Sequence, residues 1–189
     1  METPTTTTEE TLLGLLSLGP MTGYQMRALM QDSTANFWRE SYGRIYPALK
    51  RMQRAGLVER ERQTPDRSRG QKVYKITTAG QKRLRSWLGV PAQPLPNRNE
   101  LLLKLFFGNR AAPGAMAKQV LAWQQNYVVD LKRYELQLAD LEKTHAKHPA
   151  LPFWRMTLRY GMDEAITVIN WCQGTLEELK RLGTRDKGA

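Results

Sequence analysis

The sequence of 189 residues has very few residues of the kinds that form disulfides or metal sites. It contains one cysteine, Cys172, and two histidines, His145 and His148. A single cysteine excludes a disulfide within the chain and is typical of a reducing compartment, so we expect a cytoplasmic protein. The histidines have no cysteine pair near them, which favours a solvated pair over a zinc site. We therefore predict no metal and no cofactor.

Long apolar runs and a catalytic constellation are also missing. No run approaches the roughly 18 uninterrupted apolar residues of a membrane span, so we expect no membrane partner. The polar start METPTTTTEE does not resemble a signal peptide, and we expect residues 1–10 to form a disordered tail. Without a Gly-rich phosphate loop or a Cys/His pairing, catalysis has no support. We predict that the protein is not an enzyme.

Acidic residues are scarce in one region of the chain. The whole sequence has 29 Lys and Arg against 18 Asp and Glu, a formal net charge of +11. Residues 39–85 hold 14 basic and 4 acidic residues and so carry nearly all of the excess. Concentrated positive charge favours an anionic partner, most often nucleic acid or an anionic membrane surface.

Three helical patterns precede and enter this basic region. EETLLGLLSLG has a broad leucine face and ends at Gly19-Pro20, because proline cannot continue a helix. Thr22 and Gln25 form a capping box that starts a second helix. The third pattern, SYGRIYPALKRMQRAGLV, ends at Gly56 as a left-handed cap and contains Pro47 in or just after its first turn.

The third helix has one apolar side and one basic side. Ile45, Ala48, Leu49 and Met52 share the inner side. The outward side carries Gly43, Tyr46, Pro47, Lys50, Arg51 and Arg54, with almost no acid. A charged face is often merely solvated, and we interpret Arg51 and Arg54 as phosphate contacts or solvated groups. The N-terminal residues of a recognition helix meet base edges in the major groove, so the remaining residues favour DNA binding.

A hairpin and a further helix follow. LVERERQ and QKVYKIT alternate as strands, and TPDRSRG between them has turn chemistry, with Arg67, Arg69 and Lys72 at or beside the tip. Thr78 and Gln81 form a second capping box that opens another helix. Three helices, a hairpin and a helix are the order of a winged helix-turn-helix, which we place at residues 11–88.

Proline-rich residues 89–98 predict a linker, and the chain beyond it is helical. We expect a short helix in NELLLKLFFG, a long one from about 113 to 147, and a last one from about 153 to 182. Together these form an antiparallel helical domain at 99–182, followed by a tail at 183–189. A heptad stripe of this length needs a partner face, so we predict a homodimer. Its seam is expected to contain Tyr127, Leu131, Leu158, Met162, Ala165, Ile169, Cys172, Leu176 and Leu179.

The motifs of the N-terminal region resemble one bacterial family. The PadR transcriptional regulators are similar to this chain in three segments: LLGLLSLGPMTGYQM, FWRESYGRIYPALKRMQRAGLV and VYKITTAGQKRLRSWL. The long form of this family has a C-terminal helical dimerisation domain like that of the virulence activators. The resemblance implies a mainly α fold with a small β-wing that binds double-stranded DNA. A two-fold dimer would place its two recognition helices on a pseudo-palindromic operator. The expected DNA-binding residues are Tyr24, Gln25, Ser41, Tyr42, Arg44, Tyr46, Pro47, Lys50, Arg67, Arg69 and Lys72. Many members have histidine where this chain has Thr22.

The resemblance also suggests a small-molecule effector. Some family members hold planar aromatic molecules against tryptophan, and Trp123, Phe153 and Trp154 are the candidates here, although such rings are more simply core or dimer seam. We predict a homodimeric repressor that a small aromatic effector releases from DNA. Two alternatives stay open: a multidrug- or aromatic-sensing regulator acting chiefly through a dimer-interface pocket, and a winged-helix module that binds RNA or protein.

Overall fold

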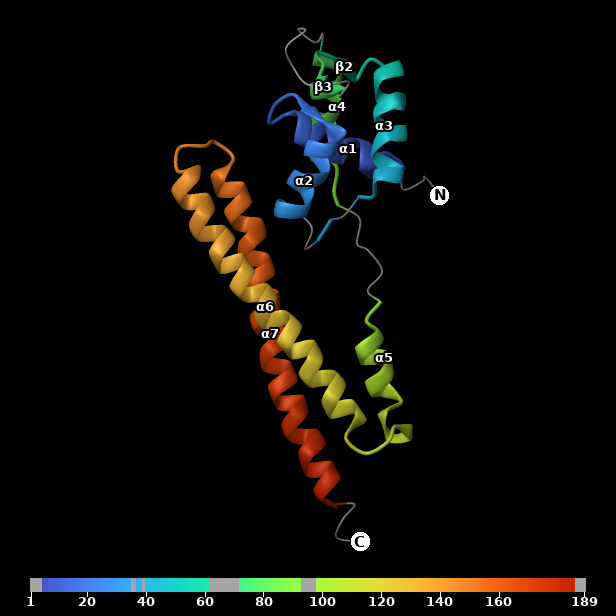
Figure 1. Ribbon diagram of the computed structural model, residues 1–189, viewed down its shortest axis with the longest axis vertical. Coiled ribbons are helices and arrows are strands. Elements are labelled where there is room, and N and C mark those ends of the chain that lie inside the picture. The colour runs from blue at the N-terminus through green and yellow to red at the C-terminus, as the bar shows by residue number, and fades with distance from the viewer. Residues whose placement is uncertain (1–4, 35–36, 39, 62–71, 93–97, 186–189) are drawn as a thin grey trace. The chain divides into compact units, whose positions relative to one another are not determined.

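The computed structural model describes residues 5–34, 37–38, 40–61, 72–92 and 98–185 (Figure 1). The chain divides into two compact units, residues 1–94 and 95–189. The boundary falls within the linker predicted at 89–98.

The described part of the N-terminal unit has the predicted order of three helices, a hairpin and a helix. The elements are α1 (Thr5–Leu16), β1 (Met21–Thr22), α2 (Gly23–Ser33), α3 (Tyr42–Arg54), β2 (Val58–Arg60), β3 (Val73–Ile76) and α4 (Thr78–Leu88). The antiparallel sheet has the strand order β1-β3-β2, with Val58 opposite Ile76 and Thr22 opposite Val73. Strand β1 is an addition to the prediction, because two residues are too few to show an alternating pattern.

The leucines of α1 form the centre of this unit. They pack against α3 and α4 and meet the inner side of α3, where Ile45, Ala48, Leu49 and Met52 are fully buried as predicted. The buried cluster consists of Leu12, Leu13, Leu15, Leu16, Met26, Met30, Ile45, Ala48, Leu49, Met52, Leu57, Val58 and Tyr74. Burial of each large apolar side chain contributes about 1.5–3 kcal/mol. One face of α3 is therefore fixed by the core, and the opposite face is left to solvent.

The local signals at the helix ends are largely confirmed. The Thr22 hydroxyl accepts from the Gln25 N–H at 3.1 Å, and the Gln25 side chain accepts from the Thr22 N–H at 2.8 Å, which completes the capping box. Gly56 has φ of 69°, and the Leu57 N–H donates to the Met52 carbonyl at 2.9 Å, as in a Schellman cap. The second box is displaced by one residue, because Thr77 rather than Thr78 caps α4 by accepting from the Gly80 N–H.

The predicted disordered tail at residues 1–10 is wrong in its second half. Helix α1 begins at Thr5, and both Thr8 and Glu10 are buried. The Thr8 hydroxyl donates to Glu40 at 2.8 Å. Composition alone suggested disorder because these residues are polar, yet polar groups can be buried when each meets a partner.

Glu9 and Glu10 bind α1 to two other helices. Arg51 Nε on α3 donates to Glu9 at 3.0 Å, and Arg83 on α4 contacts Glu9 at 3.0 Å and Glu10 at 2.8 Å. Burial alone lowers the pKa of Arg83, but the hydrogen bonds and charges of Glu10 and Glu9 outweigh it and raise the pKa above its ordinary value. The guanidinium therefore stays charged and holds the N-terminal turns of α1 in place.

Pro47 lies further inside α3 than predicted. The helix begins at Tyr42, with Ser41 as its N-cap, so Pro47 is in the second turn and does not mark the helix start. Proline has no N–H, and the Gly43 carbonyl therefore lacks the donor that a helix normally supplies four residues later. Both residues are exposed, so this carbonyl can be solvated and the break is tolerated.

The C-terminal unit is a helical hairpin with a short helix against it. It contains α5 (Glu100–Phe106), the 3-10 turn η1 (Gly108–Arg110), α6 (Ala115–Thr144) and α7 (Leu151–Arg185), and α6 and α7 run side by side in opposite directions (Figure 1). Leu101 of α5, Val120 of α6 and Cys172 of α7 form a buried cluster. Helix α7 extends to Arg185, so the predicted tail at 183–189 is helical at its start.

We expect Gly80→Ala to destabilise the N-terminal unit strongly. A β-carbon at residue 80 would overlap the Leu57 carbonyl oxygen and would lie 2.8 Å from Ile76 Cγ1. Because the first obstacle is backbone, the cost should reach about 2–3 kcal/mol, seen as a lower midpoint in urea unfolding. Gly14→Ala is the matched control, since nothing lies within 4 Å of its β-carbon position and alanine favours helix. Equal stability of the two variants would contradict this account of Gly80.

Candidate nucleic-acid interface

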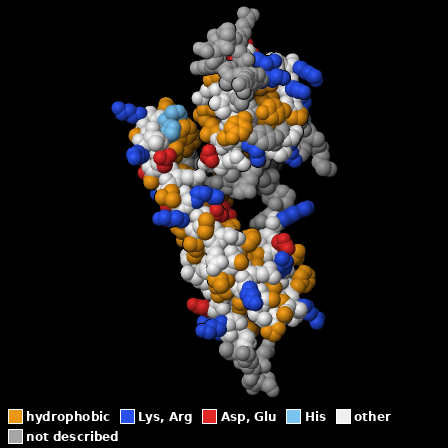
Figure 2. Space-filling model, viewed as in Figure 1, with side chains coloured by type: hydrophobic (Ala, Val, Ile, Leu, Met, Phe, Trp, Pro, Cys, Tyr) orange, Lys and Arg blue, Asp and Glu red, His pale blue; other side chains and the backbone are white. Residues whose placement is uncertain are grey.

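The outward side of α3 is a basic surface exposed to solvent. Helix α3 contains Arg44, Lys50, Arg51 and Arg54 and no acidic residue. Arg44, Tyr46, Pro47 and Lys50 are all exposed, and Ser41 is exposed at the N-cap. Figure 2 shows Lys and Arg side chains gathered over the upper part of α3. The side chain of Tyr42 lies outside what the structure describes, although its backbone is the first residue of the helix.

Two arginines of α3 have acidic partners that the sequence reading did not anticipate. Arg44 Nη1 lies 3.9 Å from Glu40, whose carboxylate is buried and also accepts from Thr8. Arg51 pairs with Glu9 while its side chain stays exposed, so an ion pair within the protein accompanies the predicted phosphate contact or solvated group. No local signal could reveal the Arg51 pair, because Glu9 is 42 residues away in the sequence.

The start of α2 lies against the same surface. Tyr24 is 62% exposed, and Gln25 is exposed although its side-chain oxygen is occupied by the capping box. The ring of Tyr46 on α3 packs against Gly23, the first residue of α2. The predicted residues at the start of α2 and those on α3 are thus brought together by the fold.

Of the three predicted wing residues, the structure describes one. Lys72 is exposed and precedes Val73, which pairs with Thr22. This antiparallel register brings Lys72 close to the start of α2. Arg67 and Arg69 lie outside the described residues. Helix α3, the start of α2 and the base of the wing therefore form one surface with exposed phenol, amide and cationic groups.

The residues of the predicted dimer seam pack within a single chain, and their contact with a second chain stays a prediction. Leu158, Ala165 and Cys172 of α7 are buried, and Tyr127, Leu131, Met162, Ile169, Leu176 and Leu179 are half-buried. Burial raises the pKa of the Cys172 thiol, as expected of a core residue. The heptad stripe of α7 faces α6 and α5 of the same chain, because the short turn at 145–150 folds the hairpin back on itself. These residues stabilise the hairpin.

The three candidate effector residues do not converge on one site. Trp123 packs against the cluster of Leu101, Val120 and Cys172. Trp154 lies at the other end of the hairpin, because it precedes Cys172 by 18 residues of α7, or about 27 Å at 1.5 Å per residue. It stacks on His148 with ring centroids 4.5 Å apart and meets His145 edge-on at 5.7 Å. Both histidines are exposed, as predicted for a solvated pair, and they also contact the indole ring. Phe153 is 68% exposed.

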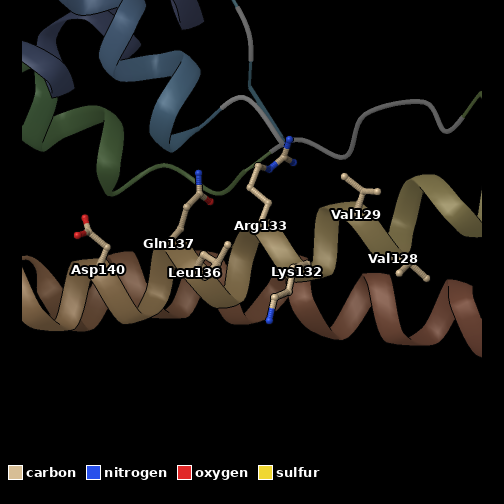
Figure 3. A pocket seen from close by; sticks show the side chains of 7 residues that line it. All are labelled: Val128, Val129, Lys132, Arg133, Leu136, Gln137 and Asp140. Atoms are coloured by element: carbon tan, nitrogen blue, oxygen red, sulfur yellow. The ribbon is translucent and has the colours of Figure 1, made fainter.

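An open hollow runs along one face of α6. Figure 3 shows that its lining side chains all come from this helix: Val128, Val129, Lys132, Arg133, Leu136, Gln137 and Asp140. None of the predicted effector residues lines it. Arg133 is held by Asp130 at 2.7 Å and lies over the Tyr134 ring at 5.1 Å, so a cation borders the exposed apolar side chains.

Metal and membrane sites receive no support from the described residues. They contain no group of three or more His, Cys, Asp or Glu side chains that could hold a metal ion. Of the helices that the structure describes, none combines the length and the apolar character that a membrane span requires.

The fold and its basic surface together define a winged helix-turn-helix protein with an added helical hairpin. Residues 12–86 match the family described as "Transcriptional regulator PadR-like family", and residues 97–180 match "Virulence activator alpha C-term". The chain is also 25% identical over 171 residues to the Negative transcriptional regulator PadR of Bacillus subtilis (strain 168), covering 87% of this chain and 93% of that protein. The chain belongs to the PadR-like family of transcriptional regulators, which confirms the resemblance.

Solved structures of similar proteins share the fold. Bacillus subtilis PadR in complex with operator DNA has a TM-score of 0.77 at 20% identity, covering 90% of this chain and 98% of that one. The same protein in complex with p-coumaric acid has a TM-score of 0.70 at 21% identity, covering 91% and 98%. The Vibrio cholerae virulence activator AphA has a TM-score of 0.73 at 23% identity, covering 93% and 99%. The predicted fold class is confirmed by these similarities.

Proposed function

We propose that this regulator binds a specific operator in double-stranded DNA through α3, the start of α2 and the wing. The observation that carries the proposal is the outer side of α3, which is basic, free of acidic residues and fixed in orientation by its buried opposite side. A recognition helix inserted in the major groove needs this arrangement, with its N-terminal residues at base edges. Tyr46 and Lys50 lie on that exposed side, where a hydroxyl and an ammonium group can meet bases or phosphates. The relative solved with operator DNA supports the proposal.

We expect Tyr46→Ala and Lys50→Ala each to weaken operator binding. A lost base or phosphate contact costs about 1–3 kcal/mol, or roughly five- to 150-fold in affinity. The operator is first obtained by selecting bound sites from a random duplex pool, and affinity is then measured by gel-shift titration. The dimer should persist, because both residues lie in the N-terminal unit.

Lys132→Ala is the matched control for charge, because Lys132 is an exposed lysine on α6. It removes the same charge from the protein and should leave affinity within about twofold of the unchanged protein. If Lys132→Ala and Lys50→Ala weaken binding equally, only overall charge matters and the specific role of α3 is excluded. A duplex RNA of the same sequence tests the alternative module, since preferential RNA binding would contradict the proposal.

We further propose that two copies of the chain pair through the exposed apolar side of α5. Leu103 is 60% exposed, Phe106 81% and Phe107 58%, and the two phenylalanine rings meet edge-on at 5.0 Å. Large apolar side chains grouped on a surface mark an interaction site. A second copy is the occupant that we propose, because two basic surfaces related by a two-fold axis would match a pseudo-palindromic operator.

Phe106→Glu is expected to shift the protein from dimer to monomer at micromolar concentration. The substitution would place a charge in an apolar contact, where its desolvation is costly. Sedimentation equilibrium gives the mass directly. Asn109→Glu adds the same charge at an exposed position of η1 and should leave the dimer intact. A Phe106→Glu protein that remains dimeric would exclude α5 as the interface.

We infer that the protein acts as a repressor and that a small aromatic molecule releases it from DNA. Two observations support this: the Bacillus subtilis relative is a negative regulator, and it has been solved in complex with p-coumaric acid. An aromatic acid of this kind has a planar ring and one negative charge. The described C-terminal unit offers partly exposed aromatic rings and cations, although Trp123 and Trp154 are too far apart to share one small molecule.

We expect p-coumaric acid or a related phenolic acid to quench tryptophan fluorescence and to lower operator affinity together. Trp123→Phe and Trp154→Phe, tested separately, show which ring reports binding, since only one of them can be near a given small ligand. An aliphatic acid of similar size is the control for charge. Unchanged fluorescence and unchanged operator affinity across a panel of phenolic acids and planar drugs would overturn the aromatic effector.

A further inference from the structure

Gly23 and Tyr46 make an unusually close contact between α2 and α3. A β-carbon built on Gly23 would lie 2.9 Å from Tyr46 Cε1, 3.0 Å from Cζ and 3.2 Å from the hydroxyl oxygen. The hydroxyl half of the phenol ring therefore rests directly on the Gly23 backbone. Tyr46 is still 42% exposed, so the residue stays accessible to solvent on the basic side of α3.

The backbone at residue 23 does not require glycine. Gly23 is the first residue of α2, and its φ is not positive, unlike that of Gly19, Gly56 and Gly114. Alanine is the better helix former, so glycine here weakens α2 by up to about 1 kcal/mol. The missing side chain is explained by the space that the Tyr46 ring occupies.

A methyl group at residue 23 would move the ring and leave the helices in place. The start of α2 is fixed by the Thr22–Gln25 capping box, and α3 is fixed by its buried inner side at Ile45 and Leu49. The atom that the methyl group would meet belongs to a side chain that can rotate about its own torsions. Rotation displaces the hydroxyl from the start of α2 at little cost to folding.

We propose that Gly23 is a positioning residue for operator recognition, which holds the Tyr46 hydroxyl at the start of α2 so that both meet the same stretch of DNA. The proposal rests on the proposed function of Tyr46 as a DNA contact. Tyr24, the next residue of α2, is exposed beside this contact, so the two phenols present a continuous surface built from two helices. Glycine at residue 23 thus leaves the space that the Tyr46 ring needs in the proposed interface.

The test is a double-mutant cycle on operator affinity with Gly23→Ala, Tyr46→Ala and the double variant. Tyr46→Ala should lower operator affinity by about tenfold or more, and Gly23→Ala should lower it to a similar extent. The melting temperature of Gly23→Ala should equal or exceed that of the unchanged protein. In the Tyr46→Ala background, Gly23→Ala should change affinity by less than about twofold, because no ring remains to be displaced. Gly14→Ala is the control, with nothing near its β-carbon position.

Each other outcome has a distinct meaning. If Tyr46→Ala weakens binding and Gly23→Ala does not, the positioning role is overturned and the DNA contact stands. If Tyr46→Ala binds normally, the proposed contact itself has failed. Equal losses from Gly23→Ala with and without the tyrosine ring would show that Gly23 acts independently of Tyr46. Failure of Gly23→Ala to fold would also overturn the proposal, because the contact would then hold the two helices together.

Discussion

The burial of α1 against α3 and α4 is the constraint on which the N-terminal unit depends. Its leucines contact the inner side of α3, so the hydrophobic effect decides which side of α3 stays exposed to water. The acids at its first turns then bind Arg51 of α3 and Arg83 of α4. A helix that carries no proposed DNA contact thereby orients the helix that carries most of them.

The same ion pairs distinguish the cationic side chains of α3 from one another. Arg51 is held by Glu9 and Arg44 lies near the buried carboxylate of Glu40, whereas Lys50 projects from the exposed side between them. Acidic residues near a DNA-binding surface reduce its attraction for phosphate in general. They also restrict the geometry of the cations that they contact. In the proposed interface with DNA, this restriction favours a defined operator over indiscriminate binding.

The C-terminal unit shows that a heptad stripe can find partner helices within its own chain. The heptad stripe from Leu158 to Leu179 contains three buried residues, and its other members are half-buried where they pack on α6 and α5 of the same chain. Periodicity identifies the side of a helix that will be buried and carries no information about which helix covers it. The exposed residues of α5 became interface candidates only after the hairpin had closed over the stripe.

The sequence by itself determined the order of the helices and the hairpin, the capped start of α2, the glycine cap of α3 and the two sides of α3. Each of these follows from periodicity or from hydrogen bonds between residues a few positions apart, which neighbours in sequence suffice to specify. The tertiary structure alone decided that α1 begins at Thr5, that Arg51 pairs with Glu9 and that the Tyr46 ring lies on Gly23. These contacts join residues separated by more than twenty positions, and only the packing of the core brings such residues within bonding distance.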